Sequence, residues 1–221
     1  MFKAAMKSLL SRKLRLVLSG VAVVLAMCFY TGADVLAVSM SNSFESLFTQ
    51  AYADIDAQVL GPVTVKDPNN PSQGARKNLP EAMLDQVRGV PGVKSAEGQI
   101  MADGARVIGK DGKVIASQGT PRFGAAYTGG GDQVMLPGGR MPKADDEVVV
   151  NAGLADKAGV KVGDTLEVLT LKPKQPFKLV GIFEHTGGRK TLGGETVVGF
   201  TKTAAQELML GQTGVYSSIS A

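Results

Sequence analysis

An uncharged apolar run near the start of the chain constrains its structure most. Residues 16–33, LVLSGVAVVLAMCFYTGA, contain no charged side chain. As a helix rising about 1.5 Å per residue they would span roughly 27 Å, close to the ~30 Å hydrocarbon core of a bilayer. No acidic residue precedes Asp34, and five basic residues precede the run: Lys3, Lys7, Arg12, Lys13 and Arg15. Because positive charge stays on the cytoplasmic side, these residues predict a cytoplasmic segment 1–15 and a transmembrane helix over 16–38, with the rest of the chain outside.

Two other interpretations of this run remain open. A cleavable signal peptide also has a basic start, but its apolar region is usually about 7–15 residues and ends at a small-x-small site. The best such site here, Val35-Leu36-Ala37, is weak. A lipoprotein signal requires a small residue directly before the cysteine, whereas Met27 precedes Cys28. The length of the run favours an uncleaved anchor.

The helical pattern continues beyond the predicted span. Apolar residues recur every three or four positions and mark one face of a helix: Leu36, Met40, Phe44, Leu47, Phe48 and Ala51. This spacing predicts an amphipathic stalk over residues 39–53. We expect Phe44, Leu47 and Phe48 to pack against the outer domain or a partner helix.

Charge and cysteine content limit the function of the outer part. Five of the 24 basic residues lie in the first 15 positions. The rest of the chain therefore has 19 basic and 20 acidic residues, and its net charge is close to zero. Nucleic-acid binding would require a basic patch together with a reading element, and the sequence offers neither. The single cysteine, Cys28, lies inside the apolar run, so no disulfide is expected in the outer domain.

Residues 54–221 have the pattern of a mixed, strand-rich α+β domain. Short apolar or alternating runs predict strands at 54–65, 147–150, 165–171, 177–184, 195–200 and 215–220. Helices are expected after Pro80, after Asn151 and from Thr203, the last with a capping box to Gln206. Asp111-Gly112 predicts a hairpin turn, whereas 67–78 and the glycine-rich 119–132 are expected to be loops. Because the chain stops just after its last expected strand, we expect a domain truncated at its C-terminal end.

No motif predicts catalysis, a cofactor or a metal. Residues 104–111 match the spacing of a phosphate-binding loop up to Lys110, but Asp111 stands where Ser or Thr is needed and a hairpin replaces the required helix. His185 is the only histidine and has no cysteine near it to complete a metal site. Asp145, Asp146 and Glu147 are consecutive, so they do not converge on one face of a strand. We therefore predict a non-catalytic chain.

An ordered set of motifs gives the chain a resemblance to a known family. The set follows the basic start and the apolar run: Gly139-Arg140-Met141-Pro142, Glu147-Val148-Val149-Val150, residues 158–166 (AGVKVGDTL), Leu179-Val180-Gly181-Ile182 and Thr196-Val197-Val198-Gly199-Phe200. In this order the chain resembles the N-terminal part of permease subunits of the FtsX-like, MacB-type ABC transporter family. The resemblance covers essentially the whole chain and implies a MacB-like periplasmic core domain.

The resemblance also implies partners, a location and a function. Such a permease lies in the cell membrane and pairs with a second permease copy or homologue. A separate cytoplasmic ABC ATPase, close to the basic N-terminal segment, drives export or extraction of lipid, lipoprotein, peptide or drug. The family usually carries at least three further spans after the outer domain, so the resemblance implies a fragment. The alternatives are a single-pass, membrane-tethered binding or scaffold protein of the cell envelope, and a secreted enzyme.

Overall fold

The computed structural model describes residues 17–33, 35, 55–66, 74–116 and 119–221. The chain divides into two compact units, Met1–Gln50 and Ala51–Ala221. We refer to the second as the outer unit.

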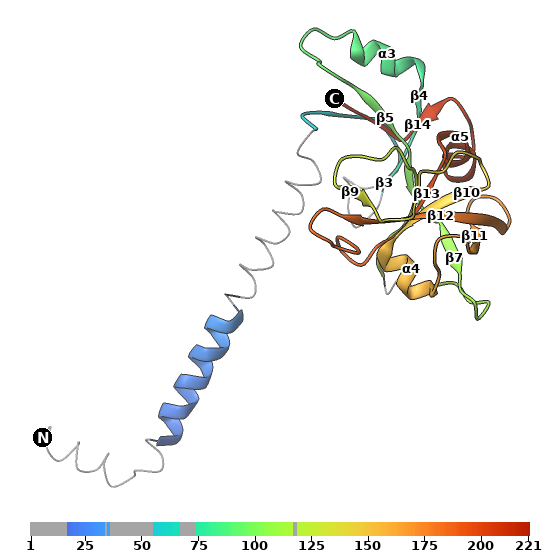
Figure 1. Ribbon diagram of the computed structural model, residues 1–221. Helices are drawn as coiled ribbons and strands as arrows, with labels where there is room; N and C mark the ends of the chain where they lie inside the picture. Colours follow the sequence, from blue (N-terminus) through green and yellow to red (C-terminus); the bar gives the residue numbers. More distant parts are fainter. Residues whose placement is uncertain (1–16, 34, 36–54, 67–73, 117–118) are drawn as a thin grey trace, which may run out of the picture. The chain divides into compact units, whose positions relative to one another are not determined.

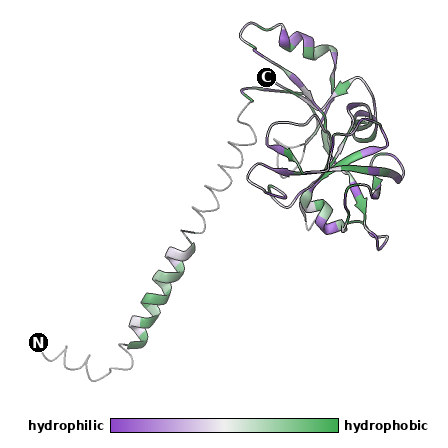
Figure 2. Ribbon diagram, in the orientation of Figure 1, coloured by the Kyte–Doolittle hydropathy of each residue, from purple (hydrophilic) through white to green (hydrophobic). Residues whose placement is uncertain are grey.

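In the first unit, residues 17–33 and 35 are helical and all of them are exposed. Apolar residues follow this helix along its length (Figure 2). Among the residues that the structure describes, no helix combines the length and apolar character needed to cross a membrane. The basic segment 1–15 and the stalk 39–53, with Phe44, Leu47 and Phe48, lie outside the described residues, so the membrane helix and the stalk stay predictions.

The outer unit is a mixed α+β fold built largely of short strands (Figure 1). Its first half contains β1 (Gln58–Leu60), β2 (Val63–Lys66), β3 (Gly74–Arg76), β4 (Leu79–Pro80), α3 (Ala82–Arg88), β5 (Glu97–Gln99), β6 (Met101–Asp103), β7 (Arg106–Ile108), β8 (Arg122–Ala126) and β9 (Gln133–Met135). Its second half contains β10 (Glu147–Asn151), α4 (Ala152–Ala158), β11 (Thr165–Leu169), β12 (Gln175–His185), β13 (Thr196–Phe200), α5 (Lys202–Ala205), the π-helical turn η1 (Gln206–Leu210), β14 (Val215–Tyr216) and β15 (Ser218–Ser220).

One large sheet organises the unit. Its strands follow the order β6-β8-β13-β10-β12-β11-β7, and β9 pairs with the far end of β12. β10 runs parallel to β12 and antiparallel to β13. The remaining strands form a three-stranded sheet, β1-β15-β5, and the pairs β14-β4 and β2-β3.

The central strand β10 separates two apolar cores. All five of its residues are buried. Val148 and Val150 join the larger core with α4, α5 and η1, whereas Val149 faces a smaller core with Val180, Phe183 and Val197. Successive side chains of a strand point to opposite faces, so a continuous apolar run is what a strand covered on both faces requires.

The smaller core is covered by the connection from β8 to β10, residues 127–146, which we call the covering segment. Tyr127 lies over Phe183 with ring centroids 5.3 Å apart. Leu136 N donates to Ile182 O at 2.8 Å, and Arg140 N donates to Val180 O at 2.9 Å. A Cβ added to Gly181 would lie 2.7 Å from both Arg140 O and Met135 Sδ. Glycine is therefore needed here because the segment crosses β12 so closely.

The predictions for the second half of the outer domain hold best. β10, β11, β12 and β13 lie on the expected runs. α4 follows Asn151 and ends at Gly159, whose φ of 63° is the left-handed cap that glycine favours. The Asp111-Gly112 hairpin is also confirmed, because Ile108 bridges Val114 and Gly112 has a φ of 76°.

Several local predictions are wrong. The supposed loop 119–132 contains β8, which pairs with both β6 and β13, and β3 lies inside the expected loop 67–78. The C-terminal helix begins after Thr201, whose hydroxyl accepts from Ala204 N, so Thr203 does not cap it. The buried side chain of Gln206 instead donates to Glu81 and to Val215 O.

The ends of the outer unit also differ from the prediction. The strands expected at 54–65 and 215–220 each divide, into β1 with β2 and into β14 with β15. β15 lies between β1 and β5 in the three-stranded sheet. It is thus paired on both sides.

Candidate functional site

The most unusual polar feature of the outer unit is a buried cluster of one histidine and two carboxylates, Asp132, His185 and Glu195. The His185 side chain is 6% exposed, and its Nδ1 lies 2.7 Å from Asp132 Oδ2. On the other side of the ring, Nε2 lies 3.4 Å from Glu195 Oε1. Both carboxylates are largely buried, with 18% and 10% of their side chains exposed. We call these three residues the histidine cluster.

Three separate stretches of chain bring the histidine cluster together. His185 ends β12, Asp132 precedes β9, and Glu195 directly precedes β13. β9 and β12 are antiparallel with His185 opposite Gln133, which places Asp132 beside the ring. Thr186 N donates to Asp132 O at 2.7 Å and closes this end of the ladder.

The turn between β12 and β13, residues 186–195, wraps around the Glu195 carboxylate. Leu192 N donates to Glu195 Oε1 at 3.0 Å and Gly193 N donates to Oε2 at 2.7 Å. Asn151 is the N-cap residue of α4, but its side chain makes no capping hydrogen bond to that helix. Its amide instead donates to Lys190 O and Glu195 O and accepts from Val197 N, so it fixes the same turn.

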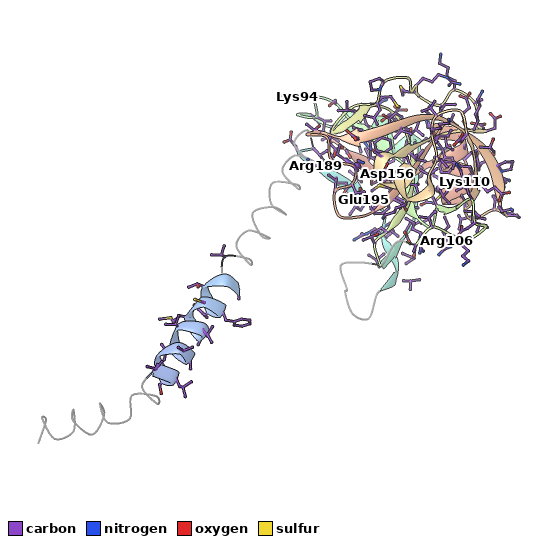
Figure 3. The ribbon with its side chains drawn as sticks, turned by 60° about the horizontal axis from the view of Figure 1, so that its bottom comes forward. Lys94, Arg106, Lys110, Asp156, Arg189 and Glu195 are labelled. Carbon is purple, nitrogen blue, oxygen red and sulfur yellow. The ribbon has the colours of Figure 1, made fainter. Side chains whose placement is uncertain are left out.

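An exposed ion pair links the turn 186–195 to Asp156 of α4. Lys190 Nζ lies 2.6 Å from Asp156 Oδ2. Figure 3 labels Asp156, Arg189 and Glu195 on the outer unit.

Burial and the neighbouring charges shift the pKa values of the histidine cluster in opposite directions. Burial raises the pKa of Glu195, but His185 and the backbone N–H groups of Gly193 and Leu192 outweigh it and lower that pKa to about 2. Burial lowers the pKa of His185, but the carboxylates of Glu195 and Asp132 outweigh it, so this pKa lies above its ordinary value. The cluster therefore favours a charged imidazolium between two carboxylates.

This geometry does not fit a metal centre. The two carboxylates contact opposite nitrogens of one ring, so they cannot converge with it on a single ion. Within the described residues, no group of three or more His, Cys, Asp or Glu side chains could hold a metal. The arrangement can hold or release a proton and can tie together the turns around it.

A second charged pair joins two of the sequence motifs. The two terminal guanidinium nitrogens of Arg140 both donate to the Glu147 carboxylate: Nη1 lies 2.7 Å from Oε2, and Nη2 donates to Oε1. Lys143 N donates to the same carboxylate at 2.9 Å. The Arg140 guanidinium is the main cause that lowers the pKa of Glu147 to about 2. This bidentate pair fastens the end of the covering segment to the start of β10.

The sequence-predicted site residues and the observed cluster do not coincide. Lys3, Lys7, Arg12, Lys13 and Arg15, predicted to orient the membrane helix, and the stalk residues Phe44, Leu47 and Phe48 all lie outside the described residues. From the sequence, the single His185 supports neither a metal site nor a catalytic triad, and its pairing with Asp132, 53 positions away, is not predicted. No local pattern links two residues so far apart, because β9 meets β12 only in the folded sheet.

Comparison with known proteins identifies the family. The model of the MacB-like periplasmic core domain matches residues 17–220, and the chain therefore belongs to that family, the periplasmic core domain of MacB-like and FtsX-like ABC transporter permeases. The resemblance inferred from the ordered motifs is confirmed.

Two solved structures are similar to the chain. The periplasmic region of MacB from Actinobacillus actinomycetemcomitans is 14% identical, with a TM-score of 0.44, over 73% of this chain and 71% of that one. The extracellular domain of YknZ, a noncanonic ABC-type transporter from Gram-positive bacteria, is 16% identical, with a TM-score of 0.43, over 74% and 80%. No curated protein sequence matches the chain.

Proposed function

We propose that this chain is the N-terminal part of the membrane permease subunit of an ABC-type transporter or mechanotransmitter. In this proposal it couples ATP hydrolysis by a separate cytoplasmic subunit to export or extraction of lipid, lipoprotein, peptide or drug. The observation that carries the proposal is the family match over residues 17–220. The chain itself would be non-catalytic, with a second permease copy and the bilayer as its other partners.

The proposal gives each region of the chain a role. Residues 16–38 would cross the cell membrane, with Lys3, Lys7, Arg12, Lys13 and Arg15 holding the N-terminus in the cytoplasm. Phe44, Leu47 and Phe48 would pack in a stalk that links the span to the outer unit. The burial of β10 between two cores supports this role, because closely packed interiors transmit strain.

The placement is tested with a single cysteine on each side of the predicted span. Cys28→Ser removes the only cysteine, after which Ser95→Cys places one in the outer unit and Ser8→Cys places one in the basic segment. We expect a membrane-impermeant maleimide to label the Ser95→Cys chain in intact cells and the Ser8→Cys chain only after lysis. The reverse pattern would overturn the proposed orientation.

The coupling is tested by isolating the chain from its own membranes in detergent. We expect an ABC ATPase subunit to co-purify and to hydrolyse ATP, and we expect joint replacement of Phe44, Leu47 and Phe48 by serine to leave this association intact while changing the turnover. Recovery of the folded chain without any ATPase subunit would instead favour the tethered scaffold protein.

A further inference from the structure

His185 lies between the carboxylates of Asp132 and Glu195, and each of its two ring nitrogens is directed at one of them. Nδ1 is at hydrogen-bond distance from Asp132, 2.7 Å. Nε2 is buried, lies 3.4 Å from Glu195 Oε1 and has no hydrogen-bond partner among the described residues. Ionised carboxylates only accept hydrogen bonds, so each contact is favourable only when its nitrogen carries a proton.

The protonation state of the ring therefore decides whether both contacts are favourable. A neutral imidazole has one N–H, which the short Nδ1 contact takes, and this turns the Nε2 lone pair toward the buried Glu195 carboxylate. An unpaired buried acceptor facing a carboxylate is costly. The imidazolium instead presents an N–H to each carboxylate.

The two carboxylates belong to segments that the ring joins. Asp132 ends the glycine turn of residues 129–131 and receives Thr186 N on its main-chain oxygen. Glu195 anchors the turn 186–195 through Leu192 N and Gly193 N. This turn contains three glycines with positive φ, Gly187, Gly188 and Gly194, so its backbone is intrinsically freer than that of the strands beside it.

Other charged groups near the ring are directed elsewhere. Glu184 precedes His185 on β12, and the alternation of a strand points it to the opposite face. Arg189 Nε donates to Thr186 O within the turn, and Lys190 pairs with Asp156. Among the described residues, Asp132 and Glu195 are the charged groups that influence the protonation of His185.

We propose that Asp132, His185 and Glu195 form a proton-dependent lock. While the imidazole is protonated, it strengthens the attachment of the turn 186–195 to the end of β12, and when the proton leaves the turn keeps only its other contacts, such as those to Asn151, and opens more easily. The lock depends only on contacts within the outer unit, so it stands independently of any coupling to an ATPase.

The direction of the pH dependence follows from the two pKa shifts. The pKa of His185 is raised above 6.5, so its stabilisation is complete below pH 6.5 and is lost as the pH rises through the folded-state pKa. The pKa of Glu195 is lowered from 4.5 to about 2, so its contribution is present above pH 4.5 and is lost as the pH falls toward 2. The lock is strongest between these limits.

Because His185 is the only histidine, its protonation can be measured without assignment ambiguity. The full chain in detergent micelles, labelled with ¹⁵N-histidine, is titrated by long-range ¹H–¹⁵N NMR. We expect both ring nitrogens to be protonated at pH 6 and the imidazole pKa to exceed 6.5. A neutral ring at pH 6 would overturn the lock.

Amide hydrogen exchange measures the release itself. After correction for intrinsic exchange, we expect protection of Leu192 and Gly193 to fall by up to about tenfold per pH unit between pH 6.5 and the raised pKa of His185, because opening releases one proton in this range, and to level off above that pKa. Protection in β10 should stay constant over the same range. Equal pH dependence in the turn and in β10 would contradict the proposal.

Two variants of matched charge change separate the lock from the rest of the turn. Asp132→Asn should lower the His185 pKa and move the release to lower pH. Asp156→Asn removes the exposed partner of Lys190 on the same turn and should leave both quantities as they are in the unmodified chain. If Asp132→Asn fails to fold, the titration of the unmodified chain still decides the proposal.

Discussion

The helix of residues 17–33 and the strand β10 are both apolar runs, yet they differ completely in exposure. In the helix, Val17, Leu25 and Phe29 are 61%, 63% and 80% exposed. In β10, Val148, Val149 and Val150 are fully buried between two cores. Burying one such side chain contributes about 1.5–3 kcal/mol. An apolar run thus indicates that a segment will be buried away from water, but it does not tell which surroundings bury it. The two cores of the outer unit bury β10, and we expect the bilayer to surround the helix.

The largest expected effect compares two phenylalanines. Phe183 is fully buried in the smaller core, and Phe29 is 80% exposed in the helix. Phe183→Ala should lower the free energy of unfolding of the outer unit by about 3–5 kcal/mol, through lost burial and a residual cavity. Phe29→Ala should leave it unchanged. Urea unfolding followed by circular dichroism checks both, and equal losses would show that the helix is part of the same core.

The second prediction introduces a charge into the helix. Val24→Arg should cost about 3 kcal/mol of insertion free energy and leave much of the chain extractable from membranes by carbonate. Val90→Arg, at a position of the outer unit that is 52% exposed, is the matched control and should stay in the membrane fraction. Retention of the Val24→Arg chain would refute the predicted anchor.

The third prediction tests how closely the smaller core is covered. In Gly181→Ala the new Cβ would lie 2.7 Å from Arg140 O and Met135 Sδ, so we expect a loss of about 1–3 kcal/mol in the free energy of unfolding. At Gly193 an added Cβ meets no atom within 4 Å, and Gly193→Ala should change the stability by less than about 0.5 kcal/mol. Similar losses in both variants would mean that the covering segment moves aside easily.

The smallest expected effect concerns the Arg140–Glu147 pair. The pKa of Glu147 is lowered from 4.5 to about 2, so the pair stabilises the fold above pH 4.5 and loses this effect as the pH falls toward 2. Arg140→Gln should lower the urea midpoint at pH 6 but much less at pH 2.5. Lys174→Gln, which removes the exposed partner of Glu167, should change the midpoint little at pH 6. A pH-independent effect of Arg140→Gln would assign its role to packing alone.

Much of the sheet could be predicted because the sequence of each of these strands has a recognisable local pattern. β10 and β13 are continuous apolar runs bounded by polar or glycine residues, and α4 ends at a glycine with the expected cap. β8 was missed because Arg122–Ala126 has no apolar alternation and adjoins several glycines. It is a strand because β6 and β13 pair with it, and such pairing leaves no mark in the local sequence.

The histidine cluster was beyond sequence reasoning for a related reason. Asp132, His185 and Glu195 lie in three separate stretches of chain, before β9, at the end of β12 and before β13, which meet only in the folded unit. The Arg140–Glu147 pair was closer to prediction, since the two motifs containing these residues were recognised side by side. The ion pair between them could not be predicted, because it depends on how the covering segment folds back to the start of β10.

The pairing of β1 with β15 has a mechanical consequence. Ala57 and Ala221 exchange two backbone hydrogen bonds of 2.9 Å, next to the ladder that begins with Gln58 opposite Ser220. A tension that separates residues 57 and 221 would load these bonds one pair at a time, as in unzipping, rather than shearing the whole ladder together. β15 would keep its pairing with β5 while β1 peels away, so the outer unit could lengthen at this seam before its main sheet carries any load.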